Sequence, residues 1–169
     1  KGFNLFKSEL LSTMYLGGSA GNIGQISFYD AARGEAYRDF ADPVAMTARS
    51  LVEGLFGIQP NALQNELVIK PGFPKHWNSA AIALPDISID FKRKNKEDVY
   101  TIVPAFRKKM QLKLLVKANG SDIVSLTVNG KLTWGLTTKD GIGVPIIEIK
   151  PDFASKYVVK IVWSGTQAG

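Results

Sequence analysis

The feature that most constrains this 169-residue chain is a change in the spacing of its apolar residues near Pro60. Before Pro60, apolar residues recur every three or four positions, as they do along one side of a helix. After it they alternate with polar residues, which is the pattern of a half-buried strand. The sequence therefore predicts a helical part at residues 1–58 and a strand-built domain at residues 59–169.

Two helices are expected in the first part. Apolar residues at helical spacing cover residues 3–16. A second helix is expected after Asp42, whose carboxylate suits the N-cap, with Pro43 at the first helical position and Gly57 as the stop signal. Between the two helices, the four glycines of residues 17–24 predict an irregular loop. The first part is therefore expected to be a helical hairpin.

The second part is expected to contain about eight strands, because runs of alternating apolar and polar residues there are separated by short, turn-rich segments. These runs cover residues 67–70, 80–84, 87–92, 99–103, 110–116, 123–127, 144–149 and 157–163. Many short strands at this spacing indicate an antiparallel β-sandwich. The predicted fold class is therefore α+β, with an N-terminal helical hairpin followed by an antiparallel β-sandwich of about eight strands.

A turn is expected at Asn129-Gly130, and its length decides how the flanking strands pair. A two-residue loop would place polar residues opposite apolar ones on each face of the hairpin. A three-residue loop would pair Leu126 with Leu132 and Val124 with Trp134, which keeps the apolar residues on one face. The pattern therefore favours the three-residue loop.

The chain has no cysteine and one histidine, His76. Without cysteine it cannot form zinc–thiolate sites, iron–sulfur clusters, thiol nucleophiles or disulfides. A single histidine disfavours multi-histidine metal sites and histidine-based catalytic triads. We therefore expect neither a metal nor a cofactor, and we assign any chemistry to carboxylates, aromatic rings, amides and basic residues.

The net charge of +6 arises in one region, because residues 90–117 contain nine basic and three acidic side chains. The run of residues 92–96 has the charge density of a polyanion-binding patch, but no aromatic residue is interleaved with it, as single-strand binding would require. We favour an exposed hairpin tip over nucleic-acid binding and keep a polyanion-binding domain as a second alternative. No apolar run approaches the roughly 18 residues of a membrane span, so no membrane partner is expected.

Two groups of residues could contact a glycan. Residues 22–42 interleave carboxylates with arginine and tyrosine, which can transfer protons, bind hydroxyls and stack on sugar rings. The same composition suits a solvated loop whose acids cap the following helix, so both interpretations stay open. Trp134 and Trp163 lie in phase with the apolar faces of their strands and are expected to be buried, whereas Trp77 lies in a turn and fits either role.

A series of residues on both sides of Pro60 carries a resemblance to a known architecture. The residues are Leu55-Phe56-Gly57-Ile58 and Pro60, followed by Leu67, Ile69, Pro71, Phe73, Pro74 and Trp77. They match the "GlfGi.P" turn and "L.I.P.lP..W" strand that lead from the last barrel helix into a C-terminal β-sandwich. The segment Asp42–Trp77 therefore resembles the C-terminal end of glycoside hydrolases and phosphorylases with an (α/α)6, or six-hairpin, barrel.

The resemblance implies that residues 1–58 are the last helical hairpin of a barrel and that residues 59–169 are the β-sandwich that braces it. The first residue is Lys1 rather than methionine, and we interpret the chain as the C-terminal part of a longer, glycoside hydrolase-like protein. The expected partners are the upstream barrel of the same polypeptide and, through it, a glycan or oligosaccharide. The resemblance also implies a periplasmic or secreted location and no activity for this part alone.

The resemblance further implies where catalytic residues would lie. In such families the catalytic acid lies upstream, and the general base can come from a loop late in the barrel. Glu35 is the candidate base in that region of this chain, with Asp30 and Asp39 as alternates. The residues expected to contact the substrate are Tyr29, Arg33, Arg38 and Trp77.

The main alternative is a carbohydrate-binding module that uses exposed aromatic rings. Two or more coplanar exposed rings on one sheet face would favour that module. Buried rings would favour the bracing role.

Overall fold

The computed structural model describes residues 2–15, 41–138 and 144–166. The chain divides into two compact units, Lys1–Leu55 and Phe56–Gly169. Each unit is described by itself below. None of the described helices is long and apolar enough to cross a membrane.

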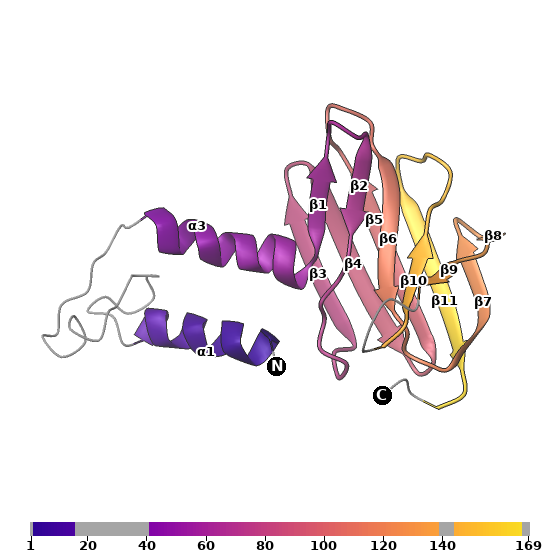
Figure 1. Cartoon of the computed structure of the whole chain (residues 1–169), viewed down its shortest axis with the longest axis horizontal. Helices are drawn as coiled ribbons and strands as arrows, with labels where there is room; N and C mark the ends of the chain where they lie inside the picture. Colours follow the sequence, from indigo (N-terminus) through magenta and orange to yellow (C-terminus); the bar gives the residue numbers. More distant parts are fainter. Residues whose placement is uncertain (1, 16–40, 139–143, 167–169) are drawn as a thin grey trace, which may run out of the picture. The chain divides into compact units, whose positions relative to one another are not determined.

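The first unit contains the two expected helices, drawn in indigo and purple in Figure 1. Helix α1 spans Gly2–Tyr15. Helix α3 spans Ala41–Arg49 and continues as a π-helical segment, η1, at Ser50–Leu55. An ion pair of 2.9 Å between Arg49 Nε and Glu53 Oε2 spans the junction of α3 and η1. The helical turns are therefore linked by a solvent-exposed pair, which stabilises a helix only slightly.

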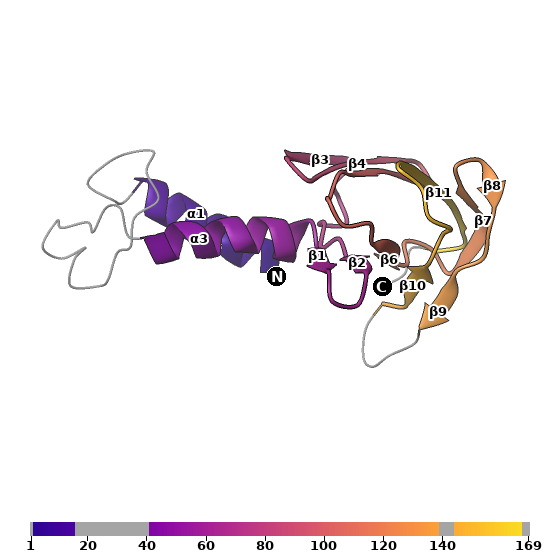
Figure 2. The same ribbon diagram turned by 90° about the horizontal axis from the view of Figure 1, so that it is seen from above.

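The second unit is a β-sandwich of two sheets, which Figure 2 shows as two layers, with β3, β4 and β11 above β1, β2, β6 and β10. Its strands are β1 (Ile58–Asn61), β2 (Glu66–Ile69), β3 (Ser79–Leu84), β4 (Ile87–Lys94), β5 (Glu97–Pro104), β6 (Gln111–Lys117), β7 (Asp122–Val128), β8 (Lys131–Leu132), β9 (Leu136–Thr138), β10 (Ile146–Ile149) and β11 (Tyr157–Ser164). The predicted α+β class and sandwich architecture are thus confirmed, and all eight expected strands are present. The described part of the chain adds three short strands, β1, β8 and β9.

The two sheets are mostly antiparallel. One sheet has the order β1-β2-β6-β10-β9 and the other has the order β3-β4-β5-β11-β7-β8. The exception is the parallel pairing of β2 with β6, which the sequence analysis did not anticipate. It arises because the chain leaves β2, builds β3, β4 and β5 in the other sheet, and then returns beside β2. Such a return does not reverse the strand direction as a hairpin would.

The core lies between the sheets because each strand turns alternate residues inward. The fully buried apolar side chains are Leu67, Ile69, Phe91, Ile89, Ile102, Leu112, Leu114, Ile149, Tyr157, Val159 and Ile161. Burial of each contributes roughly 1.5–3 kcal/mol to folding. An aromatic row reinforces this core: Phe73 contacts Phe56 at 5.2 Å and Phe91 at 5.1 Å, and Phe91 contacts Tyr100 at 4.8 Å between ring centroids.

The hairpin between β7 and β8 has a two-residue loop, so the predicted three-residue loop is wrong. Val128 pairs with Lys131. The φ angles of Asn129 (50°) and Gly130 (78°) are both positive, as a type I′ turn requires. The Asn129 side chain also donates to the Lys156 carbonyl at 2.9 Å and accepts the Val158 N–H at 2.8 Å. These two hydrogen bonds to a neighbouring segment favour the two-residue loop, although the three-residue loop would keep more apolar residues on one face.

The three-residue loop would require each strand of this hairpin to bury one regular face. Instead, β7 carries a register shift against β11 between Val162 and Trp163. Ser125 pairs with Val162 and Ile123 pairs with Trp163, so Val124 is the extra residue of a bulge and is 65% exposed. A bulge moves all later side chains to the opposite face.

Gly57 provides a test of the junction between η1 and β1. Its φ is +69°, and a Cβ atom there would overlap the backbone of Lys70, whose N–H donates to the Gly57 carbonyl at 2.9 Å. We expect Gly57→Ala to destabilise the sandwich by about 2–4 kcal/mol. The thermal midpoint, followed by β-sheet circular dichroism, would then fall by about 10 °C or more.

Gly54→Ala is the matched control, because nothing lies within 4 Å of a Cβ atom at that position. We expect the sandwich midpoint to stay unchanged in this variant. Equal midpoints for the two variants would contradict the close approach of Gly57 to Lys70.

Candidate functional site

Most of the predicted catalytic and substrate-binding residues lie outside the described residues. These are Tyr29, Asp30, Arg33, Glu35, Arg38 and Asp39. Trp77 is the member of the predicted set that the structure does describe. It is half-buried, and its ring stacks on Phe73 with centroids 6.2 Å apart and an interplanar angle of 21°. Trp77 therefore extends the aromatic row of the core, and one face of its ring is used within the sandwich.

The three tryptophans have different environments. Trp163 is 3% exposed, which confirms its predicted burial. Trp134 is 88% exposed, so its predicted burial is wrong. The reason is that β8 ends at Leu132, and Trp134 lies in the irregular segment that follows. Because one tryptophan is exposed, one is half-buried and one is buried, they do not form the coplanar platform expected of a carbohydrate-binding module.

The most elaborate polar cluster of the described chain surrounds Asp98, which has no exposed surface. Arg93 binds it with two bonds, Nε to Oδ1 at 2.6 Å and Nη2 to Oδ2 at 2.8 Å. The indole Nε1–H of Trp163 donates to Asp98 Oδ2 at 3.0 Å, and Arg93 Nη1 donates to the Lys75 carbonyl at 3.0 Å. This Asp98 cluster joins the β4–β5 hairpin to β11 and to the turn that contains Trp77.

The electrostatics of the Asp98 cluster favour a charged, closed pair. Burial lowers the pKa of Arg93, but the hydrogen bond and the charge of Asp98 outweigh burial, so its pKa is raised overall. The pKa of Tyr100 is raised, chiefly by burial and secondly by the charge of Asp98. Because Asp98 is enclosed and bound by two partners, it holds strands in place and is not a site that a substrate can reach.

Asp98 was not predicted to be buried, because it was counted only among the three acidic side chains of residues 90–117. The sequence does contain a signal that Asp98 faces the core. Residues 97–104 alternate in environment, and Asp98 is in phase with Tyr100 and Ile102, which both face the core. An acid on the buried face of a strand requires a charged or hydrogen-bonding partner.

The basic run at residues 92–96 forms the tip of the β4–β5 hairpin, as expected for an exposed turn. Lys94 pairs with Glu97 across the tip, and Asn95 adopts a positive φ of 56°. Two of the cations have partners within the hairpin: Arg93 binds Asp98, and Lys92 Nζ lies 3.2 Å from Asp90 Oδ2. Polyanion binding stays a prediction. The ion pairs of Lys92 and Arg93 leave fewer cations available for an anionic partner than the sequence suggests.

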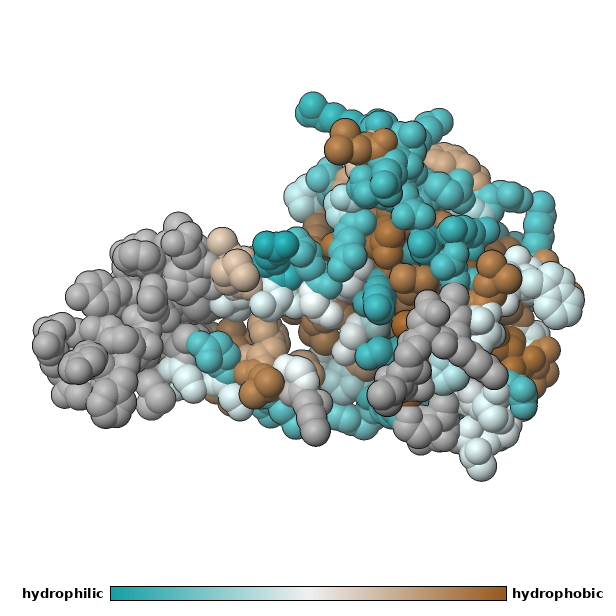
Figure 3. Space-filling view, viewed as in Figure 1, coloured by the Kyte–Doolittle hydropathy of each residue, from teal (hydrophilic) through white to brown (hydrophobic). Residues whose placement is uncertain are grey.

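The outer faces of the two sheets differ. Figure 3 shows many hydrophilic side chains over the sandwich on the side where Figure 1 places β2, β6 and β10. On these strands Lys113 Nζ lies 3.8 Å from both Glu66 Oε1 and Glu148 Oε2, and Lys150 Nζ lies 3.0 Å from Glu148 Oε1. The hydrogen bond to Glu148 raises the pKa of Lys150. This face therefore carries a group of partly buried ion pairs.

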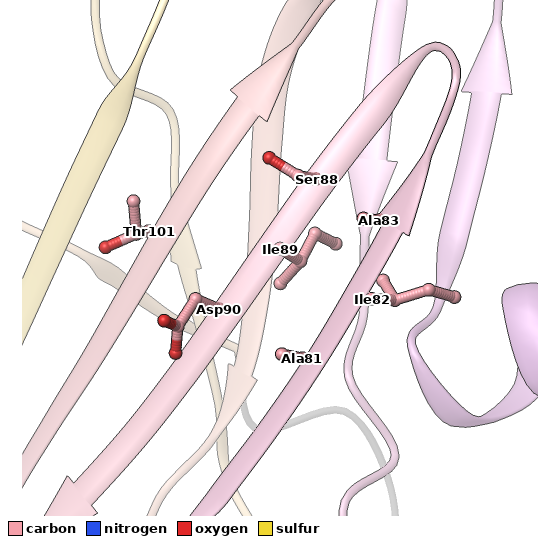
Figure 4. A pocket seen from close by; sticks show the side chains of 7 residues that line it. All are labelled: Ala81, Ile82, Ala83, Ser88, Ile89, Asp90 and Thr101. Atoms are coloured by element: carbon pink, nitrogen blue, oxygen red, sulfur yellow. The ribbon is translucent and has the colours of Figure 1, made fainter.

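The outer face of the six-stranded sheet carries a shallow depression of about 430 Å³ (Figure 4). Its lining comes from three adjacent strands and consists of Ala81, Ile82, Ala83, Ser88, Ile89, Asp90 and Thr101. Asp90 is the one carboxylate in this lining, and it pairs with Lys92. Hydrolysis of a glycosidic bond requires two carboxyl groups, so this depression does not provide a hydrolytic centre.

No group of three or more histidine, aspartate or glutamate residues in the described ranges is arranged to hold a metal ion. No family model matches the chain, and no curated protein matches it. Its function is therefore inferred from the sequence pattern and from the geometry described above.

The Asp98 cluster can be tested against an exposed pair on the same strand. We expect Asp98→Asn to destabilise the sandwich by about 3–5 kcal/mol, because it leaves the half-buried guanidinium of Arg93 without a counter-charge. Glu97→Gln, which removes the exposed 2.7 Å pair with Lys160, is expected to cost less than about 1 kcal/mol. Urea unfolding measures both values, and equal losses would contradict the role of burial.

Tyr100 gives a prediction about pH. Its folded-state pKa is raised above the ordinary value of about 10, so its contribution to stability is complete below that value and decreases as the pH rises above it. We expect the free energy of unfolding to fall as the pH rises from about 10 to about 12, and to fall less in Tyr100→Phe. The comparison uses urea unfolding at each pH, and an identical pH dependence of both proteins would refute the assignment.

Proposed function

We propose that this chain is the C-terminal portion of a glycoside hydrolase-like protein with a six-hairpin barrel. In this proposal, α1 and α3 belong to the last barrel hairpin, the sandwich braces the barrel, and the 169 residues alone have no hydrolytic activity. The observation that supports it most strongly is the amount of apolar surface that the helical unit leaves exposed.

Apolar side chains of the helical unit are exposed on more than one side of each helix. On α1, Leu5 is 73% exposed and Tyr15 is 70% exposed; on α3, Val44 is 44% exposed and Met46 is 55% exposed. None of the described side chains of α1 and α3 is fully buried. A helix of a self-contained unit has one apolar stripe facing a core and a polar opposite face. These two helices therefore have more apolar surface than the described residues of their unit cover.

Helix length leads to the same requirement. Helix α1 has 14 residues, and α3 with its continuation η1 has 9 and 6 residues. Both are near the roughly 12–15 residues at which an isolated helix is only marginally stable in water. Their stability must come from packing against other elements. Further helices of a barrel would supply that packing on several sides at once, which agrees with the family resemblance.

The start of the sandwich fits the bracing role. Phe56, the first residue of the second unit, is 5% exposed and packs edge-to-face on Phe73. The next residue, Gly57, is fixed against Lys70, which directly follows β2, the strand that pairs with β1. The first two residues of the sandwich are therefore fixed within its own fold. A brace requires such a fixed starting point.

The chemistry of the proposal assigns Glu35 as general base and an upstream residue as general acid. Inverting and retaining hydrolysis both need two carboxyl groups at a defined separation. A chain that supplies one of the two cannot complete the reaction. Asp30 and Asp39 are the alternates for the base, and Tyr29, Arg33, Arg38 and Trp77 would contact the sugar.

Activity measurements test this proposal. The 169-residue chain and the full polypeptide encoded by its gene are compared for sugar release from a panel of oligosaccharides. We expect no release by the 169 residues and measurable release by the full polypeptide. In the full polypeptide, Glu35→Gln is expected to lower kcat by about 10²–10⁴-fold.

Glu53→Gln is the control in the full polypeptide, because Glu53 pairs with Arg49 on the helix and has no proposed chemical role. Its activity is expected to equal that of the unaltered protein. Hydrolysis by the 169 residues alone, or an inactive full polypeptide, would contradict the proposal. Binding of oligosaccharides by the 169 residues that is lost in Trp134→Ala would instead favour the carbohydrate-binding module.

A further inference from the structure

Among the described strands, four lie at sheet edges, and three of them have features that discourage pairing with another chain. In the five-stranded sheet, β1 contains Pro60 and β9 has three residues; in the six-stranded sheet, β8 has two residues and begins with Lys131. Proline, charge and short length are the features by which natural proteins protect sheet edges. These three edges therefore carry some protection against unwanted strand addition.

The fourth edge, β3, has none of these features. It has six residues, Ser-Ala-Ala-Ile-Ala-Leu, with no charge and no proline. All six pair with β4 in an unbroken register, from Ser79 opposite Lys92 to Leu84 opposite Ile87. In the described chain no strand pairs with its other side. Its backbone therefore offers a straight row of donors and acceptors to an incoming strand.

The side chains of β3 also leave space for such a strand. Ser79, Ala81 and Ala83 are exposed on the outer face, while Ala80, Ile82 and Leu84 face inward and are half-buried. Half-burial of inward-facing residues is expected at an edge that lacks a neighbour. The small side chains of Ala81 and Ala83 form part of the shallow depression over the outer face of this sheet (Figure 4), so no bulky side chain of β3 stands above its edge.

We propose that β3 pairs with β3 of a second copy of this chain, antiparallel and about a two-fold axis, which joins the two six-stranded sheets. The strand can oppose itself with Ala81 facing Ala81 or with Ile82 facing Ile82. Both registers keep the alanines on the outer face and Ile82 on the inner face. Because β3 carries no charge, two copies do not bring like charges together along it. An isologous pairing uses both copies of the edge, so the assembly closes as a dimer.

The size of the contact indicates a weak dimer. Six residues extend about 20 Å along the strand, and the surface covered is on the order of a few hundred Å² per copy, below the roughly 800 Å² of a standard interface. We therefore expect a dissociation constant on the order of 10⁻⁴ M. The dimer forms through the sandwich, so it does not depend on the proposed function.

Sedimentation equilibrium of the 169-residue chain, from about 5 μM to about 500 μM, tests the proposal. We expect monomer at the low end and an increasing dimer fraction at the high end. Ala81→Lys and Ala81→Glu place a charge in the middle of the edge and are each expected to weaken dimerisation at least about tenfold. An equimolar mixture of the two variants is expected to recover the association, because opposite charges then face each other.

Ala62→Lys is the matched control, since it makes the same substitution at another exposed alanine of the sandwich. It is expected to dimerise like the unaltered chain, and circular dichroism checks that all variants keep the sheet signal. A chain that stays monomeric at the highest concentration would overturn the proposal. Dimerisation of Ala81→Lys that is as strong as that of the unaltered chain would also overturn it. Loss of dimerisation in Leu132→Lys, at the β8 edge, would do the same.

Discussion

The pair formed by Arg93 and Asp98 is the interaction on which the arrangement of the sandwich depends. Asp98 is completely buried, and an ionised carboxylate without partners in such a position would cost several kcal/mol. Arg93 supplies a two-pronged counter-charge, and the indole of Trp163 supplies one further donor. The folded state therefore requires that the β4–β5 hairpin, β11 and the turn at Lys75 meet at one point. Registers that separate these groups would leave a buried charge unsatisfied.

The two units of the chain differ in how completely they bury their apolar side chains and pair their charges. The sandwich encloses a continuous core between two sheets, pairs its buried charge, and carries a group of ion pairs on one outer face. The helical unit has no fully buried side chain among the described residues of α1 and α3. This contrast is the physical basis of the proposal that the sandwich is a brace and that the helices belong to a larger barrel. The family resemblance and the exposed helices are independent reasons for the same proposal.

The sequence predicted the regular parts of this fold because alternation of polar and apolar residues is a direct consequence of strand geometry. All eight strands expected from alternation are present. The predictions were wrong where the alternation of apolar residues continues past the end of a strand or crosses a bulge. Trp134 continues the alternation of β8 but lies outside it, and Val124 is extruded by the register shift of β7. Neither feature is visible in the spacing of apolar residues, because both depend on hydrogen bonds made by neighbouring strands.

The candidate site was less predictable than the fold. Asp98 could have been identified from its phase with Tyr100 and Ile102, but its partners Arg93 and Trp163 are brought to it by the hairpin and by β11. Of the residues predicted to act on a glycan, Trp77 is described, and its stacking on Phe73 gives it a packing role as well. The assignment of Glu35 rests on family resemblance and not on a local spacing rule.

The central claim is that the helical unit needs an upstream partner, and amide hydrogen exchange tests it most directly. The exchange of residues 2–15 and 41–49 is measured in the 169-residue chain and in the full polypeptide encoded by its gene. We expect rapid exchange of these helices in the 169-residue chain, where β4, β5 and β11 are protected, and slow exchange in the full polypeptide. Strong protection of both helices in the 169-residue chain, equal to that in the full polypeptide, would contradict this account.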